Sequence, residues 1–186
     1  MSELESVLRK LVVWLEEQGI AYVVMGGLAV RVHALPRPTN DIDFTIQLDR
    51  GRLPDVFRQA ERMGLTVPEA YKRGWVDEVS GMPIVKLRYY FQDGLGVDVD
   101  VFLAESEFQN ALIARRQSLE VDGLKCFVVS PEDLVLLKLI ASRPRDLIDV
   151  QDILFTQGTL DTAYMRPWAK QLGIANELEK VLATKH

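Results

Sequence analysis

The sequence is poor in the residues that build disulfides and zinc sites. It has one cysteine, Cys126, and two histidines, His33 and His186. A single cysteine excludes an intrachain disulfide, and these three side chains cannot form a typical Cys/His zinc site. A metal ion bound by this protein would therefore be a hard cation held by oxygen ligands.

Long apolar runs and an excess of basic charge are also missing. The longest apolar run without a charge, residues 20–30, contains two glycines and is shorter than the ~18–20 residues that cross a bilayer. The N-terminus, MSELESVLRK, is acidic and amphipathic, unlike a signal peptide. We therefore expect a cytoplasmic protein without membrane contact. The net charge of −5 disfavours extended nucleic-acid contacts but leaves a small local site open.

The length and the apolar pattern predict an α/β (α+β) fold. Hydrophobic residues make up 48% of 186 residues, enough for a full core in one compact domain. We expect strands over 21–25, 41–48, 75–79, 84–91 and 96–103, a hairpin over 118–129, and helices over 3–17, 28–34, 52–63 and 105–116. Ser130-Pro131 begins a helical region that reaches residue 183, with breaks near 143–144 and 157–158. This order predicts a short mixed β-sheet flanked by helices. The α/β core would span 1–129, and a helical lobe over 130–186 would pack on it as part of one structural domain.

Two Asp-x-Asp patterns carry the strongest chemical signal. Asp41 and Asp43 lie two positions apart in an alternating strand, so both carboxylates project from one face. Asp98 and Asp100 repeat the pattern in the strand predicted over 96–103. One such pair alone is more simply a solvated polar face. Two acidic strands that lie side by side would instead pool three carboxylates, which suit Mg²⁺ bound together with substrate phosphates.

A glycine pair, Gly26-Gly27, lies between the strand over 21–25 and the helix over 28–34. Glycines there would let the backbone approach an anion at the start of the helix. A Gly-Gly turn alone is weak evidence and is usually only a tight turn. The sequence has neither a Walker loop nor a Gly-x-Gly-x-x-Gly fingerprint.

The order of strand, Gly-Gly, short helix and Asp-apolar-Asp resembles the signature of polymerase-beta-type nucleotidyltransferases. The resemblance is carried by the two segments Val24-Met25-Gly26-Gly27-Leu28-Ala29-Val30 and Arg37-Pro38-Thr39-Asn40-Asp41-Ile42-Asp43-Phe44. Asp100-Val101-Phe102-Leu103-Ala104 is similar to the third-carboxylate strand, and residues 130–149 are similar to a helical segment with Lys and Arg-x-x-Asp. The chain resembles small bacterial minimal nucleotidyltransferases, including abortive-infection type toxins. Residues 49–95 and 153–186 carry no part of the resemblance.

The resemblance implies a nucleotidyltransferase-type sheet and an activity. A nucleoside monophosphate would pass from an NTP, ATP being the first choice, to an acceptor hydroxyl, with release of pyrophosphate. Asp41, Asp43 and Asp100 would bind two Mg²⁺ ions, and Asp98 shares a face with Asp100 and is its alternative. The residues implied in nucleotide binding are Gly26, Gly27, Arg37, Thr39, Lys138 and Asp146.

Several of these residues have a plainer alternative. Lys138 lies in an apolar helix, where it either reaches a phosphate or snorkels to solvent. Asp146 and Asp149 are one helical turn apart and either orient a nearby cation or form purely structural ion pairs. Arg37 is either a phosphate contact or a solvated loop cation.

Two other functions stay open for the whole chain. One is a catalytically silent module that binds a cognate partner protein in a toxin–antitoxin pair, and the other is a metal-dependent phosphodiesterase. The presence of all three carboxylates favours an enzyme over a silent module. The acceptor is left open among a small molecule, a protein and a tRNA end, which would enter a local pocket near Arg37, Arg143 and Arg145.

Overall fold

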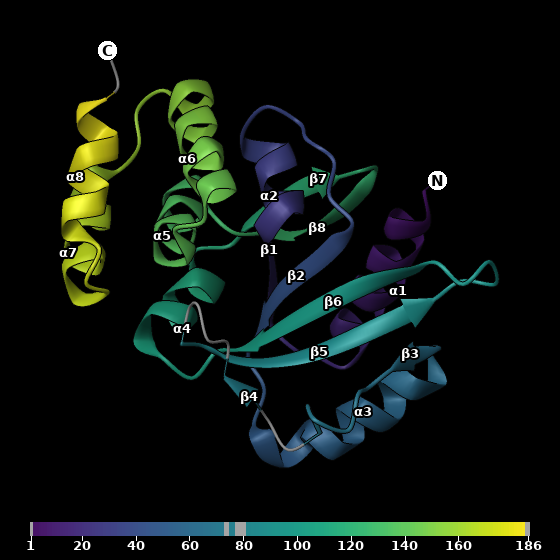
Figure 1. Ribbon diagram of the computed structural model, residues 1–186. Helices are drawn as coiled ribbons and strands as arrows, with labels where there is room; N and C mark the ends of the chain where they lie inside the picture. Colours follow the sequence, from purple (N-terminus) through teal and green to yellow (C-terminus); the bar gives the residue numbers. More distant parts are fainter. Residues whose placement is uncertain (1, 73–74, 77–80, 185–186) are drawn as a thin grey trace.

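The computed structural model describes residues 2–72, 75–76 and 81–184 (Figure 1). The helices are α1 (Glu3–Glu17), α2 (Gly26–His33), η1 (Arg50–Arg52, a 3₁₀ helix), α3 (Leu53–Arg62), α4 (Glu107–Ala114), α5 (Pro131–Ala141), α6 (Pro144–Gln157), α7 (Thr162–Gln171) and α8 (Ala175–Ala183). The strands are β1 (Tyr22–Met25), β2 (Asp41–Ile46), β3 (Leu65–Thr66), β4 (Trp75–Val76), β5 (Pro83–Tyr90), β6 (Gly96–Leu103), β7 (Gln117–Val121) and β8 (Leu124–Val128). The predicted α/β fold is confirmed. No helix in the described residues is long and apolar enough to cross a membrane.

All eight of these strands form one mixed sheet. Its order is β3-β5-β6-β2-β1-β8-β7, with β4 paired to β5. β2 runs parallel to β6 and antiparallel to β1, while β5 and β6 form a long antiparallel hairpin (Figure 1). This topology places the two strands that carry the Asp-x-Asp patterns next to each other near the centre of the sheet.

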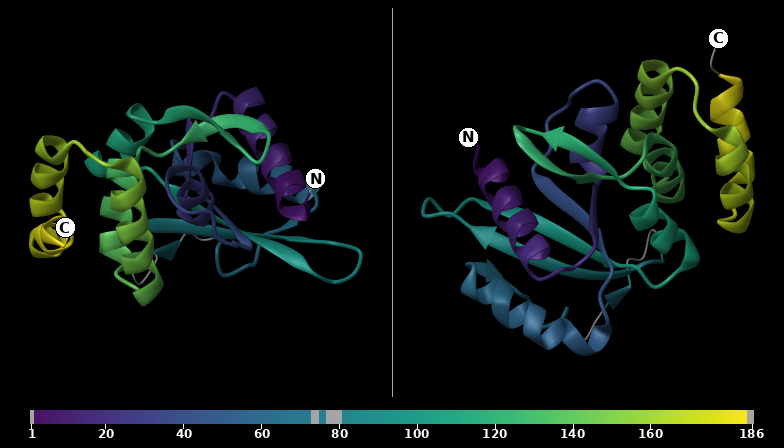
Figure 2. Two further views of the ribbon diagram at one scale, coloured as in Figure 1. Left: turned by 90° about the horizontal axis from the view of Figure 1, so that it is seen from above. Right: turned by 180° about the vertical axis from the view of Figure 1, so that it is seen from behind.

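Helices cover the two faces of the sheet unequally. Seen from behind in Figure 2, α1 and α3 lie across one face, where Leu11 and Phe57 meet apolar side chains such as Phe44 and Val85. Because side chains alternate along a strand, the opposite face receives the acids of β2 and β6. α2, α5 and α6 border that second face and leave its central part open (Figure 1).

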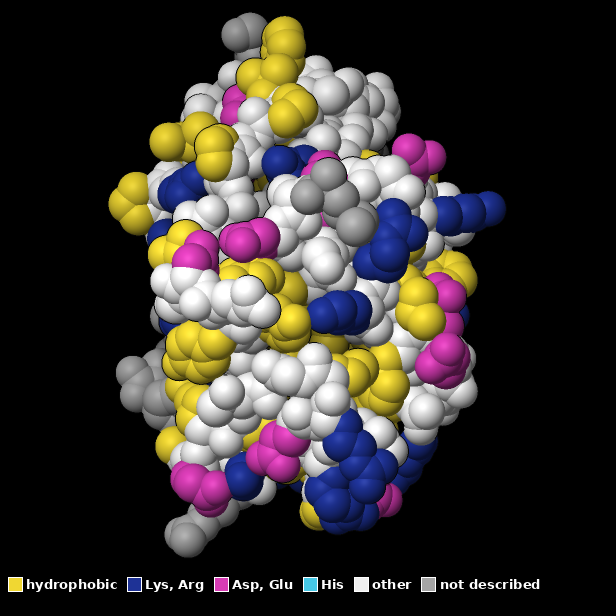
Figure 3. Space-filling view, turned by 90° about the vertical axis from the view of Figure 1, so that its right-hand side faces the viewer, with side chains coloured by type: hydrophobic (Ala, Val, Ile, Leu, Met, Phe, Trp, Pro, Cys, Tyr) yellow, Lys and Arg dark blue, Asp and Glu magenta, His cyan; other side chains and the backbone are white. Residues whose placement is uncertain are grey.

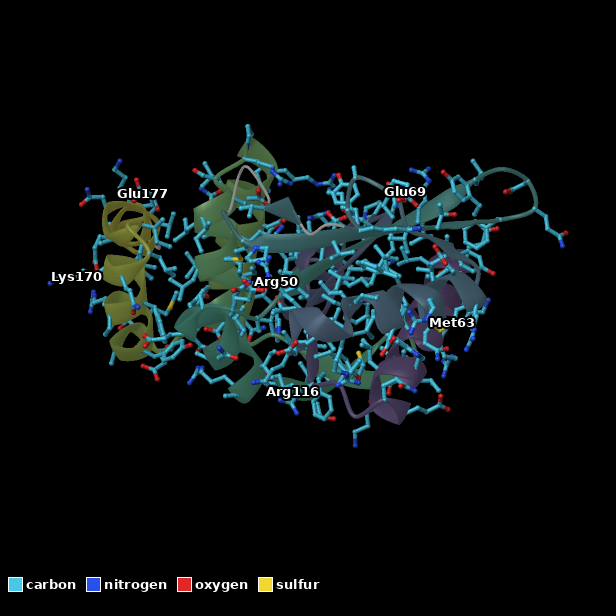
Figure 4. All side chains as sticks on the ribbon, turned by 90° about the horizontal axis from the view of Figure 1, so that it is seen from below. Arg50, Met63, Glu69, Arg116, Lys170 and Glu177 are labelled. Atoms are coloured by element: carbon cyan, nitrogen blue, oxygen red, sulfur yellow. The ribbon has the colours of Figure 1, made fainter. Side chains whose placement is uncertain are left out.

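One continuous hydrophobic core runs through the molecule and includes Val24 of β1, Leu134 of α5 and Leu178 of α8. α7 and α8 form one end of the molecule, where Lys170 and Glu177 lie, opposite Met63 and Glu69 (Figure 4). The division at residues 129 and 130 stays a prediction. On the face seen in Figure 3, basic and acidic side chains are interspersed and neither sign covers the surface.

Some element boundaries differ from the sequence prediction. α2 begins at Gly26 itself, so the glycine pair forms the first helical turn and not a loop before it. The C-terminal helical region has an unpredicted break at Gly173, whose φ of +74° ends the path of α7. β3 was not predicted because two residues are too few to show alternation. Of the strand predicted over 75–79, residues 77–79 lie outside the described residues.

Candidate active site

The two acidic strands meet in register. In the parallel pair β2 and β6, Asp41 lies opposite Asp98 and Asp43 lies opposite Asp100. All four carboxylates therefore project from the open face of the sheet. The prediction that the two acidic strands lie side by side is confirmed.

Asp43 lies at the most enclosed point of this group. Burial and, to a smaller extent, the negative charges of Asp41 and Asp100 together raise the pKa of its carboxyl group to about 7. Lys138 and Arg143 act in the opposite direction but do not cancel this effect. Burial also raises the pKa of Asp100. The carboxylates are thus held together at a cost in electrostatic free energy, which a bound cation would relieve.

Two cations of β5 face these acids across the β5–β6 hairpin. Lys86 lies opposite Asp100, with 3.0 Å between Nζ and Oδ2, and Arg88 lies opposite Asp98, with 2.9 Å between Nη1 and Oδ1. The Asp98 side chain is 57% exposed, whereas that of Asp100 is 22% exposed. Asp100 is therefore the more enclosed of the two alternatives and lies beside Asp43.

Sequence reasoning missed Lys86 and Arg88. The available signal was their spacing of two in the predicted strand over 84–91, which matches the spacing of Asp98 and Asp100 in the next strand. A tight turn at Asp93-Gly94 makes these two strands neighbours.

Gly26 and Gly27 allow the side chains of Asp43 and Thr39 to approach the backbone at the start of α2 closely. Gly26 has a φ of +62°, and a Cβ atom there would lie 1.8 Å from Oδ2 of Asp43. A Cβ atom on Gly27 would lie 2.3 Å from Oγ1 of Thr39. That hydroxyl donates a hydrogen bond to Asp41. The glycine pair thus lets the side chains of Asp43 and Thr39 pack closely against the start of α2.

Lys138 and Arg37 form a buried ion network with α6. Nζ of Lys138 lies 2.8 Å from Oδ1 of Asp146 and 2.8 Å from Oδ2 of Asp149. Arg37 donates two hydrogen bonds to Asp149, at 2.7 Å from Nε and 2.8 Å from Nη2. Burial alone would raise the pKa of Asp149, but these cations outweigh it and lower the pKa.

This network corrects two of the plainer alternatives. Lys138 is 8% exposed and does not snorkel to solvent. Arg37 is not a solvated cation, since it is paired with a buried carboxylate. The ion pairs of Asp146 and Asp149 with Lys138 agree with both interpretations of these residues, so an orienting role stays a prediction. A contact of Lys138, Arg37 or Asp146 with nucleotide stays a prediction.

An open cleft of about 640 Å³ brings the predicted site residues together. Its size lies within the range of ligand pockets, ~300–1,000 Å³. Asp149, buried behind the cleft, does not line it. The lining residues are Gly26, Gly27, Arg37, Pro38, Thr39, Asn40, Asp41, Asp43, Lys86, Asp98, Asp100, Phe102, Lys138, Arg143, Arg145 and Asp146.

The donor set of this cleft fits a hard divalent cation. Within residues 2–72, 75–76 and 81–184, no three His, Cys, Asp or Glu side chains form a group that could hold a metal ion as they stand. Asp41, Asp43 and Asp100 nevertheless offer only oxygen atoms, and the charges of Asp41 and Asp100 add to burial in raising the pKa of Asp43. Oxygen ligands with surplus negative charge are suited to Mg²⁺.

A protein-family model described as "Nucleotidyltransferase of unknown function (DUF6036)" matches residues 2–179. The chain belongs to this nucleotidyltransferase family. The family match therefore confirms the resemblance drawn from the glycine pair and the aspartates. Membership in the toxin-like group stays a prediction.

Solved structures with similar folds are nucleotidyltransferases or resemble them. An antigenic nucleotidyltransferase-like protein from Paracoccidioides brasiliensis is 22% identical over 82% of this chain and 74% of that chain, with a TM-score of 0.54. The antibiotic-resistance factor ANT(2'')-Ia is 14% identical over 94% and 95%, with a TM-score of 0.59. The lincosamide antibiotic adenylyltransferase LnuA is 16% identical over 82% and 96%, with a TM-score of 0.52. At these identities the likeness shows the fold alone. No curated protein gives a significant match.

Proposed function

We propose that this nucleotidyltransferase moves a nucleoside monophosphate from an NTP to an acceptor hydroxyl and releases pyrophosphate, with ATP as the first nucleotide to test. The observation that carries the proposal is the register of β2 and β6, which places Asp43 opposite Asp100 beside the glycine pair. The family match supports the reaction class.

The residues around the cleft suit a triphosphate. The first turn of α2 has no side-chain cap, so its backbone N–H groups are available to an anion. Arg143 and Arg145 add positive charge on the α6 side of the cleft. Lys138 lies at the base of this side, and Asp146 and Asp149 fix its ammonium group. The triphosphate would therefore lie between α2 and α6.

Asp41, Asp43 and Asp100 would hold two Mg²⁺ ions. When bound, such ions neutralise the charge that develops on the phosphate and lower the pKa of a coordinated hydroxyl group. Asp100 would face the acceptor, because β5 and β6 lie on the side of the cleft away from α2 and α6. The acceptor oxygen would attack the α-phosphorus, the bond to the bridging oxygen of pyrophosphate would break, and Asp100 would help to remove the hydroxyl proton.

The acceptor proposed here is a small molecule, a protein hydroxyl or a tRNA end. The net charge of −5 disfavours a long RNA contact, because Lys and Arg supply most of the affinity for phosphates. A tRNA end would be restricted to the neighbourhood of Arg37, Arg143 and Arg145. We retain a cytoplasmic location and a cognate partner protein as parts of the proposal.

Label transfer tests the proposal. The purified protein is incubated with Mg²⁺, cell extract and each of the α-³²P-labelled NTPs in turn, beside Asp41→Ala/Asp43→Ala. We expect the wild type alone to transfer label to an RNA, protein or small-molecule fraction and to release pyrophosphate. Co-purification of a partner without labelling would support a silent binding module. Hydrolysis of a phosphodiester without a triphosphate would support a phosphodiesterase.

A further inference from the structure

The carboxylate expected to face the acceptor already has a cationic partner within the chain. Lys86 and Asp100 lie directly opposite each other on β5 and β6, and 3.0 Å separates Nζ from Oδ2. The ammonium group therefore lies against an oxygen atom that the proposed function gives to a divalent cation. The Lys86 side chain is 40% exposed and the Asp100 side chain 22%, so the pair lies at the wall of the cleft and not in the core.

The neighbouring pair on the same two strands provides a comparison. Arg88 and Asp98 have the same cross-strand relationship and a similar contact, 2.9 Å from Nη1 to Oδ1. Asp98, however, lies opposite Asp41 at the start of β2 and is mostly exposed. The Lys86 pair thus differs from the Arg88 pair chiefly in lying beside the partly buried carboxylate of Asp43.

We propose that Lys86 is a built-in competitor of the divalent cation at Asp100. The inference rests on the proposed function and concerns the order in which that site is filled. A divalent cation at Oδ2 of Asp100 would lie next to the ammonium group and repel it, and the flexible four-carbon stem of lysine allows that group to move away. Asp41 and Asp43 face no equivalent cross-strand cation, since their β-sheet partners on β6 and β1 are Asp98, Asp100 and Met25.

This arrangement makes the second cation dependent on the nucleotide. In the nucleotide-free protein, Lys86 offsets the charge of Asp100 and lowers the demand for a cation there. A triphosphate adds negative charge to the cleft and strengthens the attraction for a divalent cation over a monovalent ammonium group. Lys86 is thus a positioning residue that keeps the acceptor-side position weakly occupied until the nucleotide is bound.

The proposal is tested by Mn²⁺ binding in the absence of nucleotide. Free Mn²⁺ is measured by electron paramagnetic resonance during titration of the wild type, Lys86→Met, Lys86→Gln, Lys86→Arg and the matched control Arg88→Met. We expect both neutral Lys86 variants to bind the second, more weakly bound Mn²⁺ ion about three- to tenfold more tightly than the wild type does. A gain of this size matches the free energy of one partly exposed ion pair. Lys86→Arg should resemble the wild type, and Arg88→Met should change the affinity less than about twofold.

Three results would overturn the proposal. Unchanged Mn²⁺ affinity in the two neutral Lys86 variants would show that the ammonium group does not compete. An equal gain in Arg88→Met would show a general charge effect and not a local one. A lack of Mn²⁺ binding in the wild type and in every variant would instead remove the proposed metal site itself. Thermal unfolding and circular dichroism identify any variant that fails to fold, and the second neutral variant then gives the answer.

Discussion

Arg37 and Asp149, 112 positions apart in the chain, form a two-point ion pair. Arg37 belongs to the loop that precedes the acids of β2, and Asp149 is a nearly inaccessible residue of α6. Their contact fixes the loop against the helix that also holds Lys138. The position of Asp41 and Asp43 relative to the basic side of the cleft thus depends on this pair.

Replacement of Arg37 by alanine is expected to lower the free energy of unfolding by about 3 kcal/mol, because it leaves a buried carboxylate with only Lys138 as a partner. Arg37→Lys should lose less, since it keeps the charge but not the two-point geometry. Urea unfolding measures both values. The matched control is Arg31→Ala, which breaks a more exposed long-range pair with Asp122 and should cost less than about 1 kcal/mol. Equal losses in both alanine variants would contradict the prediction.

Asp43 is expected to make the metal-free protein less stable as the pH rises. The pKa of this carboxyl group is about 7 in the folded protein against 3.8 ordinarily, so between these values the folded state keeps a proton that the unfolded state has lost. The free energy of unfolding therefore falls over this range and levels off above about pH 7. The loss is at most about 4 kcal/mol, since each pKa unit is worth about 1.4 kcal/mol.

Comparison of the wild type with Asp43→Asn isolates this effect. The stability gained by the variant should grow from about pH 4 to about pH 7 and then stay constant, as measured by urea unfolding without divalent cations. Addition of Mg²⁺ should stabilise the wild type above pH 7 and leave the variant nearly unchanged. A pH-independent difference between the two proteins would show that Asp43 titrates normally.

Gly26→Ala is expected to lower the rate of label transfer by at least about 100-fold, because a displacement of about 1 Å at a reacting centre can cost that much. The new Cβ atom would lie 1.8 Å from Oδ2 of Asp43 and would force the carboxylate to move. Gly19→Ala is the matched control, since Gly19 has nearly the same φ, +61°, with nothing within 4 Å of an added Cβ atom. It should cost only about 1–2 kcal/mol of backbone strain and leave activity intact. Comparable activity losses in the two variants would refute a role of the close approach.

The local parts of this site could be predicted from the sequence. Strict alternation in residues 41–48 placed Asp41 and Asp43 on one face, and the structure agrees. The register that sets Asp43 opposite Asp100 could not be read, because it depends on how β2 and β6 pack across a long intervening segment. The partners of Lys138 were equally hidden. They require a turn at Ser142, whose left-handed φ of +51° reverses the chain so that α6 faces α5.

Asp100 and Asp98 are expected to respond very differently to the same substitution. Asp100→Asn removes a charge beside Asp43 in the enclosed part of the cleft. It should lower kcat/KM for label transfer by about 100-fold or more, which is the loss expected when one group that stabilises transition-state charge is removed. Asp98→Asn removes a mostly exposed charge paired with Arg88 and should change kcat/KM by less than about threefold. Both rates are measured at saturating Mg²⁺ with folding checked by circular dichroism. The two residues lie on the same strand and face, each opposite a cation of β5, and they differ mainly in enclosure. A larger loss in Asp98→Asn than in Asp100→Asn would therefore assign the role of third carboxylate to Asp98.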